Sequence, residues 1–406
     1  MEDMIERNSP EISDADAVIA LERCIAQVRR NIPDFLTVSQ NHSSVHNVYP
    51  SCANEQWTCG FWPGELWLAF LLTGKAEFKD AGREHVHSMA HRIQHKIAVD
   101  HHDMGFLYSP SCVAAWKLAR DDEARNAALL AADQLISRFQ EKGGFLQAWG
   151  AMGTPENYRF IIDCLLNTPL LYWATQETGD AKYADIARKH TATCMRHSIR
   201  ADGSTYHTFF MDSATGEPIR GETCQGYAND SVWARGQAWA VYGTALACRH
   251  DFHEEYRDAF SKTSSFFLSR LPYDNVPYWD MIFTDATARQ SLVWEPRDSS
   301  SASIVACAML EMASQLQAKG TVAETGGLTS ADCKHIARVL LKSLADDYAV
   351  RLDTPSNGLV LHGTYSKKSP YNTCTQEGVD ECVSWGDYFY MEALTRLMYP
   401  AWKSFW

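Results

Sequence analysis

The sequence predicts an all-α single domain in which six helical hairpins close into a ring. Apolar residues recur with the 3.6-residue period of helices along most of the 406 residues, and the two-residue alternation of strands is scarce. A unit made of an apolar helix, a Gly or Asp turn and an amphipathic helix recurs five times. One single helix remains near each end of the chain. If these two helices pack side by side, they make the sixth hairpin and close a ring of six inner and six outer helices.

The predicted helices follow one another in a regular order. Asp14 caps the first helix, which runs to about Arg30 and is ended by Pro33, and residues 38–56 form an irregular loop. The five hairpins and the final helix are expected at residues 60–72 and 75–97, 105–118 and 121–140, 160–175 and 181–197, 232–249 and 254–271, 300–317 and 330–350, and 383–398.

One domain is expected to hold all of these helices. No Pro/Gly/Ser-rich linker divides the chain, so residues 14–406 are predicted to form a single barrel domain. Residues 1–13 are expected to be a disordered or loosely ordered lead. Two short stretches, 204–209 and 358–362, have strand character and are expected to form loop hairpins.

Composition and charge exclude several classes of function. The net charge of −13 argues against nucleic acid and anionic membranes as partners. No apolar leader and no run of about 18 apolar residues occurs, so we expect neither a cleaved secretory signal nor a membrane span. The 12 cysteines include no C-x-x-C pair, so neither a zinc site nor a thioredoxin-like motif is indicated. Scattered cysteines of this kind favour reduced thiols and a cytoplasmic location.

One apolar stretch, residues 160–173, carries a single carboxylate in its middle, that of Asp163. Desolvation disfavours the charged form of a carboxyl group, so Asp163 among Ile, Cys and Leu is expected to hold its proton more tightly than a surface Asp. A carboxyl group that is protonated near neutral pH is what a general acid requires. The alternative is a core Asp that hydrogen-bonds a neighbouring loop, and this stretch alone leaves both interpretations open.

The loops that enter the inner helices are rich in polar and aromatic residues, and in a ring they gather at one end around a central pocket. Asp103 lies at the entrance to one inner helix and Asp163 at the entrance to the next. Two carboxylates on either side of a sugar are the usual equipment of glycoside cleavage. Because Asp163 has the more apolar neighbours, it is the better candidate for the acid. The accompanying loop residues include Trp57, His101, His102, Trp149, His207, Gln225, Arg235 and Trp239.

Several of these residues also have plain structural interpretations. His101, His102 and Asp103 resemble a metal cluster, but no further pair of ligands has the right spacing, so we expect neither a metal nor a cofactor. Arg297 and Asp298 are expected to form a structural ion pair. A single Trp ring fills a core more often than it stacks on a sugar. No G-x-G-x-x-G, P-loop or G-x-S-x-G motif supports nucleotide binding or a serine nucleophile.

At these residues the sequence closely resembles the unsaturated glucuronyl hydrolases, glycoside hydrolase family 88, from about residue 15 onwards. The resemblance implies an (α/α)6 barrel, a six-hairpin toroid, in agreement with the hairpin count. Seven segments carry the resemblance in the family's order: residues 57–64 (WTCGFWPG), 101–109 (HHDMGFLYS), 161–167 (IIDCLLN), 204–209 (STYHTF), 234–239 (ARGQAW), 298–302 (DSSSA) and 385–388 (WGDY).

The resemblance also implies a reaction and a role for individual residues. The family removes a 4,5-unsaturated uronic acid from the non-reducing end of lyase-generated oligosaccharides by hydrating the C4=C5 vinyl ether. On this basis Asp163 delivers a proton to C4 and helps direct water to C5, while Asp103 holds the sugar hydroxyls and assists. Arg235 also suits the substrate carboxylate because it carries a positive charge. The full set of expected substrate contacts is His102, His207, Gln225, Arg235, Trp239, Tyr365, Trp57 and Trp149.

Two loops, residues 226–230 and 362–369, depart from the family's pattern and leave the preference for sulfated or unsulfated glycosaminoglycan open. Lys367 and Lys368 either meet a sulfate or are ordinary solvated lysines, and the second interpretation is slightly favoured. The alternative functions are an unsaturated rhamnogalacturonyl hydrolase acting on pectin fragments, a sugar 2-epimerase-like isomerase and a non-catalytic carbohydrate-binding protein. The expected partner is an unsaturated uronic-acid-containing oligosaccharide, and the protein is expected to be a monomer or a weak homodimer.

Overall fold

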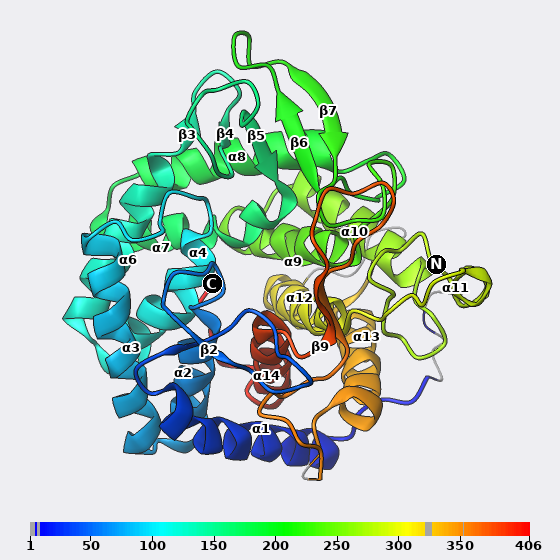
Figure 1. Cartoon of the computed structure of the whole chain (residues 1–406). Coiled ribbons are helices and arrows are strands. Elements are labelled where there is room, and N and C mark those ends of the chain that lie inside the picture. Colours follow the sequence, from blue (N-terminus) through cyan, green and yellow to red (C-terminus); the bar gives the residue numbers. More distant parts are fainter. Residues whose placement is uncertain (1–4, 6–8, 321–326, 352) are drawn as a thin grey trace.

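The helices are arranged as a ring of pairs, as Figure 1 shows. The computed structural model describes residues 5, 9–320, 327–351 and 353–406. The inner helices are α2 (Phe61–Thr73), α4 (Met104–Tyr108) with α5 (Ala114–Ala119), α7 (Pro169–Thr178), α9 (Ala234–His250), α12 (Ser299–Lys319) and α14 (Ser384–Met398). The outer helices are α1 (Asp14–Phe35), α3 (Ala76–Gln94), α6 (Asp122–Ile136), α8 (Lys182–Ser198), α10 (Glu254–Ser269) and α13 (Ser330–Ser343).

The first and last helices close the ring, as the sequence predicts. Helix α1 packs against α14, and α14 also packs against α2 on one side and α12 on the other. Helix α12 in turn contacts α9, and α9 contacts α7. The inner helices α9, α12 and α14 are buried on nearly every side, which explains why they read as continuous apolar runs without a polar face.

The first helix continues past the proline that was expected to end it. Helix α1 includes Pro33 and ends at Phe35, so the prediction that Pro33 ends the helix is wrong. Tertiary contacts hold the last turn, because the Phe35 carbonyl accepts a hydrogen bond from the Trp62 indole at 3.1 Å and lies 2.8 Å from the His85 ring. Ser13 caps the start of α1, and part of the predicted lead, residues 1–4 and 6–8, lies outside the described residues.

The predicted helix over residues 160–175 is wrong in its first half. Residues Arg159–Ile161 form strand β5, Ile162–Leu166 form a 3₁₀ turn, and an α-helix begins only at Pro169. The aromatic and β-branched residues before Asp163 favour a strand when a partner strand is available. That partner is β6 (Thr208–Met211), which pairs antiparallel with β5 and is followed by β7 (Pro218–Glu222).

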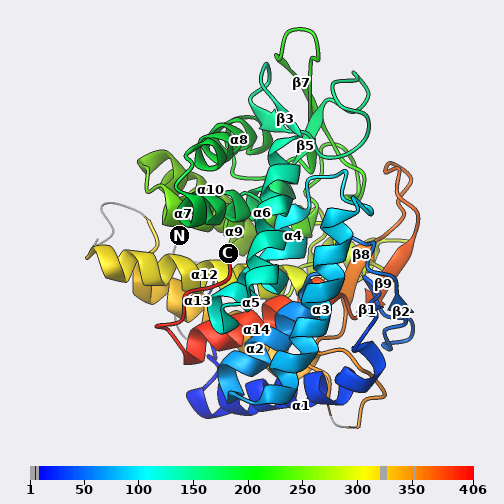
Figure 2. The same cartoon turned by 90° about the vertical axis from the view of Figure 1, so that its left-hand side faces the viewer.

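The remaining strands are short hairpins in the loops, and Figure 2 shows β1, β2, β8 and β9 together along one side of the helices. Strands β1 (Ser39–Gln40) and β2 (Ser51–Cys52) pair with each other, as do β3 (Phe139–Gln140) with β4 (Phe145–Leu146) and β8 (Gly363–Ser366) with β9 (Glu377–Glu381). The strands expected at 204–209 and 358–362 are thus displaced toward the C-terminus by several residues, because strand pairing sets the ends of a hairpin and a single strand's composition does not. A short helix, α11 (Asp285–Gln290), was not predicted.

The C-terminal residues fill the ring from the end opposite these loops. The Trp406 ring is 2% exposed, stacks on Phe389 at 5.7 Å and packs edge-on against Phe106. Its indole N–H donates to the Glu392 carboxylate at 2.7 Å. The interior is therefore a packed aromatic core and not an open channel.

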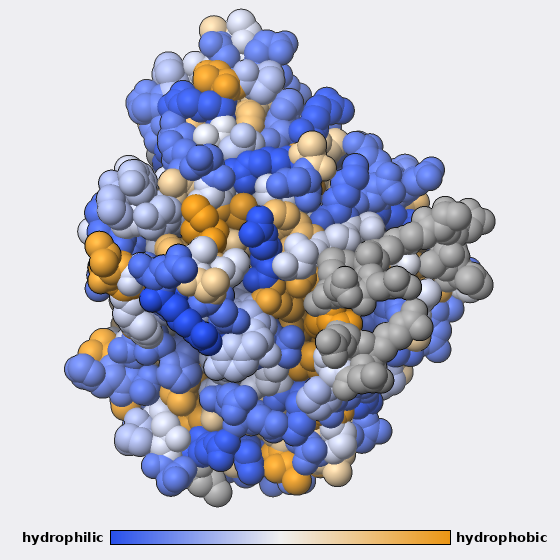
Figure 3. All heavy atoms as spheres, turned by 90° about the vertical axis from the view of Figure 1, so that its right-hand side faces the viewer, coloured by the Kyte–Doolittle hydropathy of each residue, from blue (hydrophilic) through white to orange (hydrophobic). Residues whose placement is uncertain are grey.

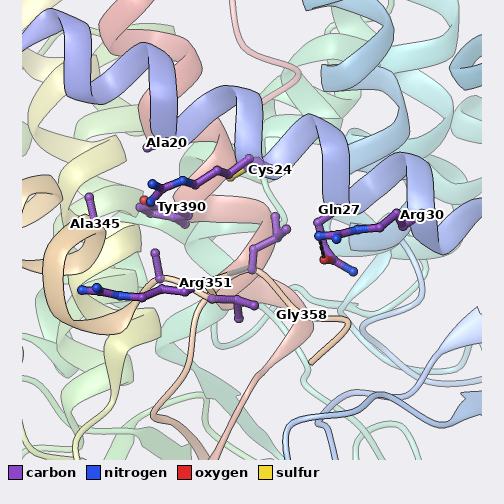
Figure 4. Close-up of a pocket in the computed structure, with 12 residues that line it drawn as sticks. Ala20, Cys24, Gln27, Arg30, Ala345, Arg351, Gly358 and Tyr390 are labelled. Carbon is purple, nitrogen blue, oxygen red and sulfur yellow. Dashed lines mark hydrogen bonds between the residues drawn. The ribbon is translucent and has the colours of Figure 1, made fainter. Parts of the chain in front are cut away.

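A separate pocket lies on the α1 side of the ring (Figure 4). It is formed by α1, α14, the turn that follows α13 and the segment before β8, with Cys24, Gln27, Ala345, Gly358 and Tyr390 among its lining residues. None of the residues predicted to act on the substrate lines this pocket. Among the helices of the described ranges, none is both long and apolar enough to cross a membrane.

Candidate active site

Strand pairing places Asp163 beside His207. The ladder between β5 and β6 pairs Ile161 with Thr208, and it continues for one step as the Ile162 N–H donates to the His207 carbonyl at 3.0 Å. Asp163 is the second residue of the 3₁₀ turn that follows. The strand that sequence reasoning missed is therefore what brings two of the predicted site residues together.

A close backbone contact brings the Asp103 loop against the same turn. Gly105, in the first turn of α4, lies so near Asn167 that a Cβ atom there would come within 2.3 Å of the Asn167 Cα. The Asn167 side chain accepts a hydrogen bond from the Phe106 N–H at 2.9 Å. Only glycine permits this approach, which sets Asp103 opposite Asp163.

The His102 ring lies between the two carboxylates. Its Nε2 is 3.3 Å from Asp103 Oδ1 and 3.5 Å from Asp163 Oδ1. The His102 side chain is 1% exposed, whereas those of Asp103 and Asp163 keep 12% and 17% of their surface exposed. His102, which was expected to contact the substrate, is thus the deepest member of this group, and the carboxylates are the more accessible ones.

The two carboxyl groups have opposite pKa shifts. Burial, reinforced by the negative charge of Asp103, raises the pKa of Asp163 well above its usual value. Burial also acts on Asp103, but the neighbouring His102 and His101 outweigh it and hold the pKa of Asp103 below its usual value. These opposite shifts favour the protonated form of Asp163 and the ionised form of Asp103, and acid catalysis by a pair of carboxyl groups requires one of each form.

His207 is placed to donate a hydrogen bond. Its Nδ1 accepts from the Cys224 N–H at 3.0 Å, so the ring proton is on Nε2. Burial, together with the charge of Arg235, lowers the pKa of His207 to about 3 and keeps the ring neutral. Its ring packs against Trp233 with the centroids 4.4 Å apart.

The Arg235 guanidinium is enclosed by protein groups. It donates to the carbonyls of Thr364 and Tyr365 at 2.6 and 2.7 Å and lies between the rings of Trp233 and Trp385 at 4.4 and 4.6 Å. The side chain is 1% exposed. Its positive charge lowers the pKa of Asp163, although burial outweighs this effect. In this geometry Arg235 fixes strand β8 beside the site.

Asp298 is the anionic partner of Arg235, at 3.6 Å, and accepts hydrogen bonds from the Ser300 and Ser301 hydroxyls. The expected ion pair between Arg297 and Asp298 is therefore wrong. Arg297 instead lies 3.1 Å from Asp274 and 3.4 Å from Asp285. Neighbouring residues at the start of α12 point to different sides, which a sequence pair cannot reveal.

Tyr365 joins several of the predicted site residues. Its carbonyl accepts from the Gln225 side chain at 3.0 Å as well as from Arg235, and its hydroxyl accepts from the Trp57 indole at 3.4 Å. The Trp57 ring in turn stacks on Trp385, 5.1 Å between centroids. Gln225, Tyr365 and Trp57 thus form one connected wall of the site.

The other two predicted tryptophans have different surroundings. Trp149 is 38% exposed and faces the His102 ring edge-on at 6.2 Å, so it stands at the entrance to the carboxylate pair. Trp239 is 1% exposed and packs on Phe106 and Phe389 in the core of the ring. Trp149 is available to a ligand, and Trp239 supports the site from below.

His102, Asp103 and Asp163 also offer ligand atoms within 4.8 Å of one another, a spacing that a cation could bridge. A metal ligand must be deprotonated. Since burial and Asp103 favour the protonated form of Asp163, a proton competes with a cation at this position. The donor set suits proton sharing better than metal binding.

Sequence reasoning assigned no role to three supporting residues. Trp233 and Trp385 enclose Arg235, and Asp280 is completely buried and accepts from the N–H groups of Tyr227 and Val232 at 2.7 and 3.2 Å. The available signal for Asp280 was a carboxyl group between Trp279 and Met281, much as Asp163 lies between Ile162 and Cys164.

With this geometry in place, comparisons with known proteins identify the family. The model of Glycosyl Hydrolase Family 88 matches residues 32–310. The chain belongs to glycoside hydrolase family 88. The unsaturated chondroitin disaccharide hydrolase of Streptococcus pneumoniae is 44% identical over 387 residues, which cover 95% of this chain and 93% of that protein.

Family 88 members of known structure share the whole fold. The unsaturated glucuronyl hydrolase of Streptococcus agalactiae superposes with a TM-score of 0.90 at 39% identity, covering 98% of this chain and 96% of that one. The enzyme from Bacillus sp. GL1, responsible for the degradation of glycosaminoglycan, superposes with a TM-score of 0.85 at 37% identity, covering 95% and 97%. The predicted (α/α)6 barrel and the resemblance to unsaturated glucuronyl hydrolases are confirmed.

Proposed function

We propose that this family 88 protein removes a 4,5-unsaturated uronic acid from the non-reducing end of lyase-generated oligosaccharides. The observation that carries the proposal is the pair Asp103 and Asp163, which lie on either side of the His102 ring and have pKa values shifted in opposite directions. Relatives along the full length of the chain carry the names of unsaturated glucuronyl and chondroitin disaccharide hydrolases, which supports the same reaction here.

The chemistry begins with the proton on Asp163. Transfer of this proton to C4 of the substrate breaks the C4=C5 double bond and leaves positive charge shared between C5 and the ring oxygen. The Asp163 carboxylate then accepts a proton from a water molecule that bonds to C5, which restores the acid. The resulting hemiketal opens to a ketone, and the freed hemiacetal at C1 expels the aglycone and becomes an aldehyde.

The surrounding residues support these steps without taking part in the bond changes. The ionised Asp103 raises the pKa of Asp163 and is available to accept hydrogen bonds from sugar hydroxyls. The neutral His207 offers its Nε2 proton as a donor. The exposed Trp149 and the wall made by Gln225, Tyr365 and Trp57 provide the flat and polar surfaces that a sugar ring needs.

We infer that the leaving sugar belongs to a glycosaminoglycan and carries negative charge. Lys367 lies at the end of β8 and is 9% exposed, and its ammonium is 5.8 Å from the centre of the Trp279 ring. Among the contacts of the described residues, this ammonium has no anionic partner. An S. agalactiae Asp-to-Asn variant has been solved with dGlcA-GalNAc6S bound, which supports a sulfated substrate. Lys368 is exposed and donates to the Asn372 carbonyl, as expected of an ordinary loop lysine.

Incubation of the protein with the unsaturated disaccharide from chondroitin lyase tests the reaction. A hydrolase removes the ultraviolet absorbance of the alkene and releases one equivalent of hexosamine. An epimerase leaves the absorbance unchanged, and a non-catalytic binding protein binds the disaccharide without turnover. A rhamnogalacturonyl hydrolase consumes only the pectin-derived disaccharide, so the same assay with that substrate completes the comparison.

We also propose that the protein works in the cytoplasm as a monomer or weak homodimer. All twelve cysteines are free thiols, and ten of them are buried, which suits a reducing compartment. Sedimentation over a range of protein concentrations tests the oligomeric state, and a tight dimer at nanomolar concentration would contradict the proposal.

A further inference from the structure

Two cysteine thiols lie in contact beside the wall of the candidate active site. Strand pairing sets Cys52 of β2 opposite Ser39 of β1, and the Cys52 thiol lies 3.3 Å from the Gln40 carbonyl. The Cys59 thiol lies 3.7 Å from the carbonyl of Ala53, the residue after Cys52. The two thiols hydrogen-bond to each other, and Cys59 also hydrogen-bonds to the Ser39 side chain. Each sulfur is thus within reach of the other.

A buried arginine holds the loop between these two cysteines. Arg92 is 1% exposed. Its guanidinium donates to the carbonyls of Glu55 and Gln56 at 3.0 and 2.9 Å and to the Asn54 side chain at 3.0 Å. The same guanidinium hydrogen-bonds to Cys59. A cation beside a thiol favours the thiolate, which is the reactive form of cysteine.

The pKa values of the two thiols are shifted in opposite directions. The hydrogen bond from Cys52 lowers the pKa of Cys59, and the hydrogen bond with Ser39 adds to this effect. The positive charge of Arg92 acts in the same direction, and together these contacts outweigh burial, which raises the pKa of Cys59. The hydrogen bond with Cys59 raises the pKa of Cys52. A thiolate with a protonated thiol next to it is typical of redox-sensitive cysteine pairs.

Cys52 gives a small oxidant access to the pair. It is half-buried, whereas Cys59 is 1% exposed, and Figure 2 shows β2 on the outside of the helices. Figure 3 shows that apolar atoms on one side of the molecule form small groups among polar ones. An oxidising partner protein generally binds to a broader apolar patch. Peroxide, a polar molecule little larger than water, is therefore the oxidant that this surface suits.

We propose that peroxide oxidises Cys52 and Cys59 to a reversible disulfide. The Cys59 thiolate attacks one peroxide oxygen, which breaks the O–O bond, releases hydroxide and leaves a sulfenic acid on Cys59. The Cys52 sulfur then bonds to the Cys59 sulfur, and the sulfenic oxygen leaves as water with the Cys52 proton. Each sulfur gives up one electron, and peroxide is reduced to water and hydroxide. A small dithiol reverses the reaction by thiol–disulfide exchange.

The disulfide acts on the candidate site through Trp57, which lies between the two cysteines in the sequence. The Trp57 indole donates to the Tyr365 hydroxyl at 3.4 Å, and its ring stacks on Trp385. A covalent bond draws the two sulfurs closer than a hydrogen bond does, and it removes the thiolate that faces Arg92. We expect Trp57 to shift with this loop, which weakens its contact with a sugar. This consequence, unlike the disulfide itself, rests on the proposed function.

Mass spectrometry of the whole protein after peroxide treatment tests the pair. Trypsin cuts after Arg30 and Lys75 and at no position between them, so one peptide carries Cys52 and Cys59 and no other cysteine. When free thiols are alkylated before digestion, we expect this peptide to escape alkylation and to have lost two hydrogens. Dithiothreitol should restore both thiols. Cys52→Ser should instead keep oxygen on Cys59, because the second thiol is gone.

The matched control is Cys224, which is the other half-buried cysteine and lies alone in the tryptic peptide of residues 221–235. Cys224 should still be alkylated under conditions that oxidise the pair. The inference is overturned if Cys52 and Cys59 are oxidised no faster than Cys224. It is also overturned if the peptide that carries the pair gains oxygen without losing hydrogens.

The disaccharide assay measures the effect on the site. We expect the oxidised wild type to have a KM roughly twofold to tenfold above that of the reduced protein, and dithiothreitol to restore the lower value. Reduced Cys52→Ser should match the reduced wild type. An unchanged KM in fully oxidised protein would show that Trp57 does not follow the disulfide. No turnover by the reduced wild type contradicts the proposed function, and the mass-spectrometric result then still decides whether the disulfide forms.

Discussion

Two aspartates with the same side chain acquire different chemistry from their surroundings. Asp163 lies among buried apolar groups, and within the described residues its Oδ1 atom accepts no hydrogen bond, so the charge of Arg235 offsets only part of the cost of burying a negative charge there. Asp103 has His101 at 2.9 Å and His102 at 3.3 Å, both of which favour its ionised form. The acid is therefore the carboxyl group with fewer partners.

This arrangement predicts how the pH profile responds to Asp103→Asn. The negative charge of Asp103 raises the pKa of Asp163, so its removal lowers the pKa of Asp163. Since activity requires the protonated form, kcat/KM falls at high pH as Asp163 loses its proton. We expect the alkaline limb to move to lower pH in Asp103→Asn, together with a loss of activity.

A pH profile of kcat/KM on the unsaturated disaccharide measures this shift. A substitution that only damages the structure lowers activity at every pH and leaves the limb in place. An alkaline limb that stays unchanged, or moves to higher pH, would mean that Asp103 does not act on the proton of Asp163.

The raised pKa of Asp163 could be predicted from its sequence neighbours, because an Asp between apolar residues such as Ile162 and Cys164 is expected to be buried. The role of His102 could not. Its position between the carboxylates depends on Asp163 approaching from a segment far along the chain. Arg235 shows the same limit, since one of its two tryptophan neighbours, Trp385, comes from α14.

At the scale of elements, strand β5 positions Asp163, where the sequence predicted a helix. Strand β5 ends at Ile161, and its register with β6 determines the position of Asp163 relative to His207. An apolar run of this length suits either a helix or a buried strand, and only the partner strand decides between them. Such a partner is a long-range contact, which explains why the sequence pattern was misleading here.

Gly105 offers a test of how these elements meet. A Cβ atom at this position would clash with the Asn167 backbone, so Gly105→Ala forces α4 away from the turn that carries Asp163. We expect a loss of about 1 to 3 kcal/mol in the free energy of unfolding and a larger relative loss of kcat. Denaturant unfolding and the disaccharide assay measure the two effects.

The control for this substitution is Gly327→Ala, where no atom of the described residues lies within 4 Å of the added methyl group. It should leave stability and activity close to those of the wild type. If Gly105→Ala behaves like Gly327→Ala, the close packing of α4 on Asn167 does not determine the geometry of the site.

At the scale of the whole molecule, the ring depends on a charged network at the end opposite the loops. Glu311 of α12 lies 2.7 Å from Arg396 of α14 and 3.5 Å from Arg249 of α9. Arg396 also bonds Glu392, which accepts from the Trp406 indole. Three inner helices and the C-terminal residues are thus joined by one set of buried groups.

This network predicts a loss of stability in acid. Burial opposes ionisation of Glu311, but Arg396 and Arg249 outweigh it and lower the pKa of Glu311 from 4.5 to about 2. A lowered pKa contributes stability above the unfolded value, which is lost as pH falls toward the folded value. We expect the stability difference between the wild type and Glu311→Gln to narrow by about 2 kcal/mol between pH 6 and pH 3.

Urea unfolding at several pH values measures this difference. At neutral pH the substitution should cost about 3 to 5 kcal/mol, because Arg396 and Arg249 both lose a buried anionic partner. A difference between wild type and variant that is independent of pH would show that Glu311 is not the titrating group.

The ring itself was predictable from the sequence because it depends on local helical periodicity and on a count of hairpins. The closing contact of α1 with α14 follows from that count. The C-terminal filling of the ring was not predicted, since residues after Met398 carry no periodic pattern. The short strands and the loop contacts were not predicted either, because they also lack a periodic sequence pattern. These strands and loops complete the site.

The central claim is that Asp163 supplies the proton, and turnover by Asp163→Asn tests it most directly. The amide is close in size to the carboxyl group but cannot donate an acidic proton, so fold and disaccharide binding should persist. We predict that kcat falls by about 10²-fold to 10⁴-fold, which is the usual contribution of a general acid. Near-normal turnover by a correctly folded Asp163→Asn variant would contradict the claim.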